Sequence, residues 1–240
     1  MPGGKFRRAR RTVTAVTVLA LKVALAPALV VAATLAGRRW GAAVAGIVTA
    51  LPVVAGPILA VITIEHGREF GAEAARSALF GLVALAAFGA AFARAAGAGR
   101  TWPVTLGIGW LTYFAVAGAL SWIDAPAVVG LLAALAGMVV AAWIVGPAPR
   151  RVTPEHPPPA WDLPVRAGLT AVLVVAVTGA AGSLGPALSG VLTPFPVAMT
   201  VIAAFVLAQD GPEAARSLMY GFVRALPGFA ATFFIVAIVL

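Results

Sequence analysis

The side chains that could do chemistry in this chain are a few charged residues set in long apolar stretches. A segment of the form Gly-x-Glu-Ala-Ala-Arg-Ser starts at Gly71 and carries Glu73 and Arg76. The same segment recurs 140 residues later with Glu213 and Arg216. Ionisable side chains inside a membrane are costly, and they commonly mark a substrate path or a fixed ion pair. The repeated spacing of three residues therefore predicts either a binding site or Glu–Arg pairs that fix helix packing.

A second repeated block lies upstream, at an offset of 144 residues. Its aligned pairs are Lys22 with Arg166, Thr49 with Thr193, and Pro52 with Pro196. Proline removes one helical hydrogen bond and leaves a carbonyl one turn back without its partner. In a membrane that carbonyl needs another donor, so we expect kinked or discontinuous helices at both prolines, with Thr49 as a local donor. The two blocks indicate an internal duplication, with a four-residue difference in the loop at residues 64–70.

The composition is that of a membrane protein. Of the 240 residues, 62% are hydrophobic and 10% are charged, and the mean hydropathy is +1.02. Apolar runs of about 20 residues recur, and each is long enough to cross a bilayer as a helix. These runs are continuously apolar, whereas the strands of a membrane β-barrel alternate apolar and polar residues, so the runs argue against a barrel. We therefore predict an all-α polytopic membrane protein. The chain has no cysteine, which excludes disulfides and thiolate metal sites.

The formal net charge of +9 is carried by loops and by the N-terminus. Basic residues at the ends of spans anchor them to anionic lipid and set their orientation, so we expect membrane lipids as partners and no nucleic acid. The five basic residues before residue 12 predict a cytoplasmic N-terminus. The bias towards Ala, Gly, Val and Arg is typical of a GC-rich bacterial genome, and it indicates the bacterial cytoplasmic membrane.

The predicted organisation has about eight spans. Residues 1–12 are a basic N-terminus, 13–97 a first repeat of three spans, 98–146 two connecting spans, 147–164 a Pro-rich linker, and 165–240 a second repeat of three spans. Five spans precede the second copy, so the two copies should cross the membrane in opposite directions. Such inverted-topology repeats are common in secondary transporters. If one connecting segment does not cross the membrane, the copies are parallel instead.

Three local expectations follow from the pattern. Residues 38–40 should form an interfacial turn after the first span. The third span should begin near Gly71, with Glu73 and Arg76 in its first turn, where an acid suits the helix dipole. The linker should extend to Pro164, with Arg166 opening the sixth span.

The order of these features resembles the GlpM-like family of small bacterial inner-membrane proteins. The resemblance covers residues 22–97 and 166–240, and the tandem fusion departs from the family's single-copy pattern. It implies a membrane protein of this class rather than a particular substrate. The residues that carry it are Lys22, Pro52, Gly71, Glu73 and Arg76 in the first copy, and Arg166, Pro196, Gly211, Glu213 and Arg216 in the second.

These observations favour a secondary transporter or flippase-like carrier for a small anion or a phosphate-bearing lipid. If the charges converge at the repeat interface, two Glu–Arg pairs hold the bundle, and Lys22 and Arg166 remain as unpaired cations that attract an anion. Alternatively these two cations extend to the membrane surface, and the protein is a non-transporting scaffold or a channel. No nucleophile, nucleotide or metal motif is present in the sequence, so we expect neither an enzyme nor a cofactor.

Overall fold

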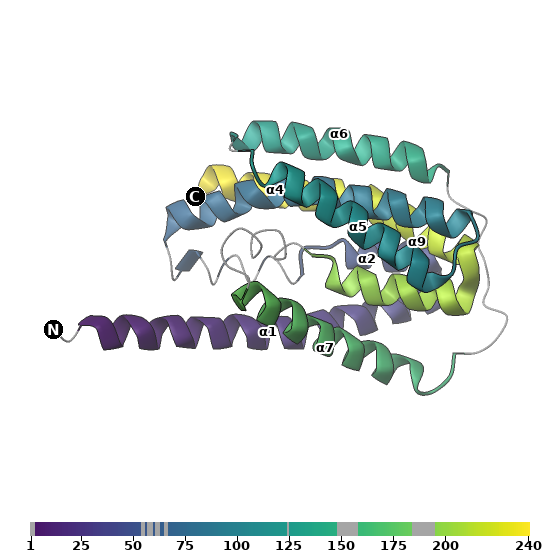
Figure 1. Ribbon diagram of the computed structural model, residues 1–240, viewed down its shortest axis with the longest axis horizontal. Coiled ribbons are helices and arrows are strands. Elements are labelled where there is room, and N and C mark those ends of the chain that lie inside the picture. The colour runs from purple at the N-terminus through teal and green to yellow at the C-terminus, as the bar shows by residue number, and fades with distance from the viewer. Residues whose placement is uncertain are drawn as a thin grey trace.

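The computed structural model describes residues 3–53, 56, 60, 63–64, 67–123, 125–147, 158–183 and 195–240. Side chains are described within these ranges except at residues 3–18, 22 and 180–183. The helices are α1 (Gly3–Trp40), α2 (Ala42–Thr49), α4 (Arg68–Gly97), α5 (Trp102–Leu120), α6 (Ala127–Val145), α7 (Asp162–Ser183) and α9 (Val197–Val239) (Figure 1).

Every regular element in these ranges is a helix, which confirms the all-α prediction. Six of the helices are long and apolar enough to cross a membrane, namely α1, α4, α5, α6, α7 and α9. The two connecting segments that the sequence predicted as spans are helices of 19 residues each, α5 and α6. A helix of 19 residues is about 28 Å long, which is close to the thickness of the hydrocarbon core.

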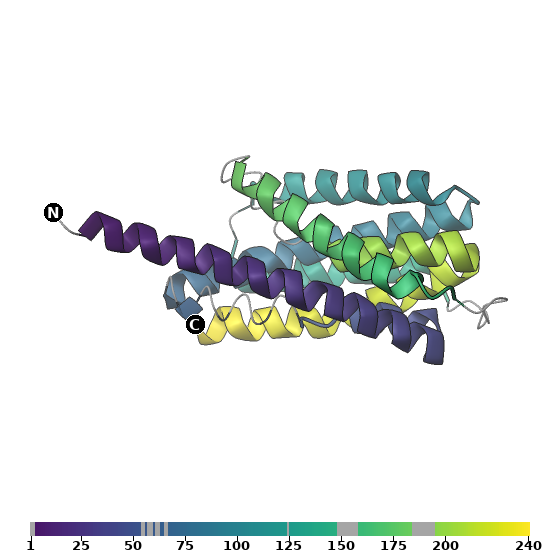
Figure 2. The same ribbon diagram turned by 90° about the horizontal axis from the view of Figure 1, so that it is seen from below.

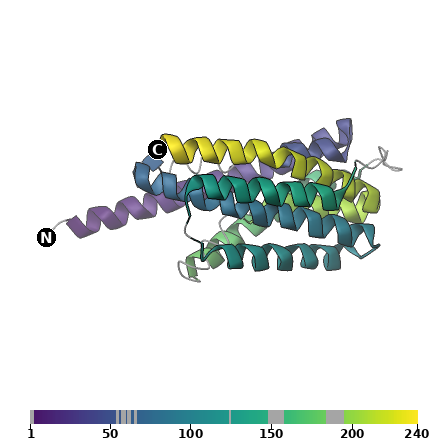
Figure 3. The same cartoon turned by 90° about the horizontal axis from the view of Figure 1, so that it is seen from above.

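The bundle has α4 at its centre. This helix packs against α9, α5 and α6, and sixteen of its 30 residues are buried, many of them alanine or glycine. Small residues let helix backbones approach closely where the surrounding lipid is as apolar as the protein. On the other side of the bundle, α1 packs against α7 and α2, and α2 packs against α9 (Figures 1 and 3).

Helices from the two predicted copies run in opposite directions. In Figures 1 and 2, α1 runs from left to right and α7 runs from right to left beside it. In the same way α4 runs from left to right, whereas the second half of α9 runs back from right to left to the C-terminus. The pairs α1 with α7, and α4 with the second half of α9, are therefore antiparallel.

Two glycines with positive φ lie at the start of α4 and at the kink inside α9. Gly67 precedes α4 with φ 94° and ψ 168°, and Gly211 kinks α9 with φ 82° and ψ −177°. Residues that carry a side chain rarely adopt these backbone angles, so glycine suits both positions. The two glycines are 144 residues apart, which is the offset of the upstream block. The Gly71 motif therefore sits about one helical turn further along its helix than its counterpart at Gly211.

This shift corrects the expected position of the first Glu–Arg pair. Because α4 begins at Arg68, its first turn contains Glu69, and Glu73 and Arg76 lie in later turns. In the second copy Glu213 does lie in the first turn after the kink at Gly211.

The boundaries of two other segments also differ from the prediction. Residues 38–40 continue α1 as helix, and the chain turns at Gly41, where φ is 99°. The predicted linker ends early, because α7 begins at Asp162 rather than after Pro164. Proline fits the first turn of a helix, where its missing N–H would have no partner, so Pro164 does not delay the helix.

The contact between α2 and α9 depends on two glycines. A Cβ atom at Gly221 would meet the carbonyl oxygen of Ala43, and a Cβ atom at Gly46 would meet the carbonyl oxygen of Leu218. The two backbones are therefore in direct contact, and no larger side chain fits at either position without moving a helix.

We predict that Gly221→Ala destabilises the protein by about 1–3 kcal/mol, because the added methyl group overpacks a backbone contact. Gly228→Ala is the matched control, since a Cβ at Gly228 in the same helix would meet nothing within 4 Å. Thermal unfolding of the detergent-purified variants, followed by tryptophan fluorescence, measures the difference. Equal melting temperatures for the two variants would contradict the packing described above.

Candidate functional site

The two Glu–Arg motifs lie at opposite ends of the bundle. Glu73 and Arg76 are exposed near the start of α4. Arg216 lies beside the other end of that helix, because a Cβ atom on Gly97 would be 3.4 Å from its Cδ. The 21 residues from Arg76 to Gly97 span about 30 Å of helix. The charged residues of the two motifs therefore do not converge on one central site.

The expected pairing within each motif is weak. In the second copy, Nη1 of Arg216 is 3.9 Å from Oε1 of Glu213, and the Glu213 side chain is 58% exposed. Among the described residues no ion pair joins Glu73 to Arg76. Exposed pairs of this kind contribute little to stability.

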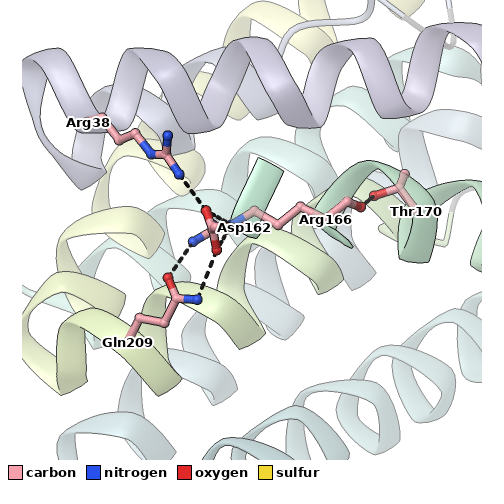
Figure 4. A network of polar contacts seen from close by, with 5 residues as sticks. All are labelled: Arg38, Asp162, Arg166, Thr170 and Gln209. Carbon is pink, nitrogen blue, oxygen red and sulfur yellow. Dashed lines mark hydrogen bonds and ion pairs between the residues drawn. The ribbon is translucent and has the colours of Figure 1, made fainter. Parts of the chain in front are cut away.

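Arg166 instead belongs to a polar network that joins three helices. The network connects Arg38 at the end of α1, Asp162 and Arg166 in the first turns of α7, and Gln209 of α9 just before the kink (Figure 4). Asp162 is fully buried and Arg166 is 4% exposed. Three segments that are far apart in sequence thus meet around one carboxylate.

Each carboxylate oxygen of Asp162 accepts two hydrogen bonds. Oδ1 accepts from Nε of Arg166 at 3.0 Å and from Nε2 of Gln209 at 2.8 Å. Oδ2 accepts from Nη2 of Arg38 at 2.6 Å and from Nε of Arg166 at 2.9 Å. A buried charge is tolerated only when it is paired and its remaining lone pairs are satisfied, and Asp162 meets both conditions.

Arg166 has partners of its own besides this carboxylate. Its Nη2 donates to Oε1 of Gln209 at 3.0 Å, and its guanidinium carbon lies 4.7 Å from the centre of the Phe205 ring. The hydroxyl of Thr170 donates to the carbonyl oxygen of Arg166 at 2.7 Å. The expectation that Arg166 is an unpaired cation is therefore wrong for this conformation, because Arg166 is paired with Asp162.

The residues predicted as site residues near the two prolines do not lie together in the structure. The Thr49 hydroxyl donates a hydrogen bond to the carbonyl oxygen of Ala45 at 2.7 Å. It therefore does not donate to the carbonyl one turn before Pro52. Pro52 lies in the turn that follows α2, and Pro196 is buried directly before α9. Thr193 and the side chain of Lys22 lie outside the described part of the chain.

An aromatic cluster holds the start of α9 against α5. The ring of Phe195 stacks on Phe114 at 5.4 Å and meets Tyr113 edge-on at 5.5 Å. Nε1 of Trp110 donates to the hydroxyl of Thr200 at 3.2 Å. Offset or edge-on aromatic pairs add stability beyond their buried area, so these contacts anchor the start of α9 to α5.

Sequence reasoning missed Arg38, Asp162 and Gln209. Two signals for Asp162 are nevertheless visible. Asp162 and Arg166 are four residues apart, the spacing that places side chains together on a helix. An acid followed by proline two residues later is also typical of a helix N-terminus. Arg38 and Gln209 carry no such signal, because only the packing of α1 and α9 against α7 brings them to the carboxylate.

No family model, curated protein or solved structure matches this chain. The resemblance to the GlpM-like family therefore stays a prediction from the sequence. Within the described residues, no group of three or more His, Cys, Asp or Glu side chains is placed to hold a metal ion.

We predict that Asp162→Asn lowers the free energy of unfolding by about 3 kcal/mol, because it leaves two buried or half-buried arginines without their carboxylate. Glu213→Gln, which removes a largely exposed acid, should cost less than about 1 kcal/mol. Both values come from thermal or denaturant unfolding in one detergent. A loss for Asp162→Asn no larger than that for Glu213→Gln would show that the network does not hold the three helices together.

Proposed function

We propose that this protein is a membrane carrier built from two inverted copies, and that it moves a small anion or a phosphate-bearing lipid. The bacterial cytoplasmic membrane, with the N-terminus in the cytoplasm, is the proposed location. The observation that carries the proposal is the antiparallel pairing of equivalent helices, since many secondary transporters are built from inverted repeats that rock around a central interface.

The packing of α1 on α7 supports a pseudo-two-fold axis in the membrane plane. Thr170 and Val174 are buried on α7, and the residues 144 positions earlier, Ala26 and Val30, are buried on α1. Equivalent faces of the two helices are therefore turned inwards. Two helices related by a two-fold axis must meet through the same face, and the burial of equivalent residues on both helices fits this requirement.

Eight crossings follow if each copy contributes three. The kink at Gly211 divides α9 into two segments that run in opposite directions, which would form the seventh and eighth spans (Figure 1). In the first copy, α2 would begin the second span. The proline positions then fall at equivalent points in the two copies, where transporters commonly have broken helices.

The Asp162 network would close one end of the interface between the copies. It ties α1 of the first copy to α7 and α9 of the second. In a rocking carrier these ion pairs break when that end opens, and Arg38 and Arg166 then become available to an anion. Asp162 would act as a built-in competitor that restores the closed state after the anion leaves.

The sequence at the equivalent position in the first copy is different. There, Lys22 aligns with Arg166, Val18 aligns with Asp162 and Glu65 aligns with Gln209. The first copy therefore has no carboxylate at the position of Asp162, and its acid, Glu65, stands at the position of Gln209 instead. We propose that Lys22 supplies the cation for an anionic substrate.

A scaffold function is the second candidate, and the complete hydrogen bonding of Asp162 favours it. In a scaffold the network would stay closed and would only fix the register of α1, α7 and α9. The two candidates differ in one requirement: a carrier must break the network in every cycle, and a scaffold must never do so.

We expect purified wild-type protein in proteoliposomes to exchange radiolabelled inorganic phosphate or to move a fluorescent phosphatidylglycerol across the bilayer. Lys22→Ala should lower the rate at least about tenfold, because it removes one of the few cations within a span. Arg39→Ala, at the exposed end of α1, is the control and should retain the rate.

If wild-type protein moves neither probe, and neither Lys22→Ala nor Glu73→Gln alters any response to phosphate, the scaffold replaces the carrier. Single-channel currents in planar bilayers would instead identify a channel.

A further inference from the structure

One ionisable side chain beside the Asp162 network takes no part in its hydrogen bonds. Asp210 directly follows Gln209 and directly precedes Gly211, the glycine at the kink of α9. Its side chain is half-buried, and among the described residues no hydrogen bond or ion pair joins it to another group. Partial burial without a donor disfavours the charged form of a carboxyl group relative to its protonated form. Asp210 is therefore a place where a proton could bind.

The surroundings of Asp210 act on its charge in opposite directions. Asp210 lies in the turn between the two halves of α9, and burial raises its pKa more than the nearby charges lower it. Among those charges, the guanidinium group of Arg166 lowers the pKa, the carboxylate of Asp162 raises it, and Arg38 lowers it. Within the described residues no charge of α4, α5 or α6 is among them, α2 carries no charge, and Glu213 on α9 itself is largely exposed.

The first copy has a titratable residue at the equivalent sequence position. His66 stands 144 residues before Asp210 and directly before Gly67, so each of these two positive-φ glycines follows a residue that can gain or lose a proton. Histidine changes its charge near neutral pH. His66 lies outside the described part of the chain, so this comparison concerns sequence position alone. Gly67 and Gly211 lie at opposite ends of the bundle, and each end thus has one such residue in the sequence (Figure 1).

Asp210 is placed where a change of its charge would affect the end of the bundle that the network closes. Its neighbour Gln209 donates to Oδ1 of Asp162, at the point where three helices meet (Figure 4). Asp162 keeps its charge, because the donors around it favour the carboxylate. Opening of that end would expose Asp210 to water, which stabilises its charged form. The closed end therefore holds a proton on Asp210 more tightly than the open end does, and closure weakens as the pH rises through the pKa of Asp210.

We infer that Asp210 is a proton-binding site, and that the bound proton controls whether the Asp162 network is closed. The protonated form suits the half-buried position, whereas the charged form draws water to the kink and favours the open end. His66 is the corresponding residue of the first copy. This role rests on the opening of this end in the proposed carrier, and it makes the proton a second ligand of that carrier.

The test uses a reporter thiol that only an open end exposes. Thr34 lies one turn before Arg38 on α1 and is 5% exposed. Its hydroxyl has no hydrogen-bond partner among the described residues, so Thr34→Cys loses no hydrogen bond. The rate at which this thiol reacts with a water-soluble maleimide is measured on the full-length protein in detergent, from about pH 5 to about pH 8. The same rate is measured with Asp210→Asn added, and the ratio of the two rates removes the intrinsic pH dependence of the thiol reaction.

We expect the ratio to be near one at the acidic end of this range and to rise at least about fivefold at the basic end. A pKa that differs by one unit between two states changes their ratio by up to about tenfold, and Asp210→Asn removes this change because its amide does not titrate. Glu213→Gln is the matched control, since it removes an exposed acid three residues away and should retain the whole rise. Asp210→Ser serves the same purpose if Asp210→Asn does not fold.

A ratio that stays constant over this pH range overturns the inference. Absence of labelling at every pH overturns it as well, because this end would then not open, and a rise that Glu213→Gln abolishes would assign the proton to Glu213 instead. Transport is measured separately in proteoliposomes. A rising ratio in protein that moves no substrate would reject the carrier and keep the proton site, whereas a constant ratio in protein that does transport would reject the proton site alone.

Discussion

The burial of one carboxylate in an apolar helical bundle is the constraint on which the arrangement of α1, α7 and α9 depends. Asp162 cannot remain charged in that environment unless donors surround it, and the donors come from three helices. The end of α1, the start of α7 and the kink of α9 must therefore meet at one point. From that point α1 and α7 extend side by side, and α9 packs along α4.

Small residues provide the second constraint, because hydrophobic burial does not distinguish one helix pairing from another in lipid. Gly46 and Gly221 permit backbone contact between α2 and α9, and the alanine-rich faces of α4 allow it to pack on three neighbours. Polar contacts thus fix the end of the bundle, and steric fit fixes its middle. The aromatic contacts of Phe195 add a third attachment, which links the start of α9 to α5.

The sequence predicted the helical class and the positions of α5 and α6, because apolar runs of membrane length leave few alternatives. It did not predict the network, because Arg38 and Gln209 are brought to Asp162 only by tertiary packing. The sequence also predicted a site at the repeated Glu–Arg motif, but the two occurrences of that motif lie at opposite ends of α4. A repeat in sequence specifies equivalent positions in each copy, and an antiparallel arrangement separates those positions whenever they lie near helix ends.

The most direct measurement concerns the direction in which the copies cross the membrane. Because the chain has no cysteine, single cysteines can replace Glu73 and Glu213, which are both exposed near the starts of α4 and of the second half of α9. An impermeant maleimide on intact cells should label only one of the two positions, and both should react after the cells are permeabilised. Labelling of both positions in intact cells, or of neither, would mean that the copies are parallel, and the account of an inverted carrier would be contradicted.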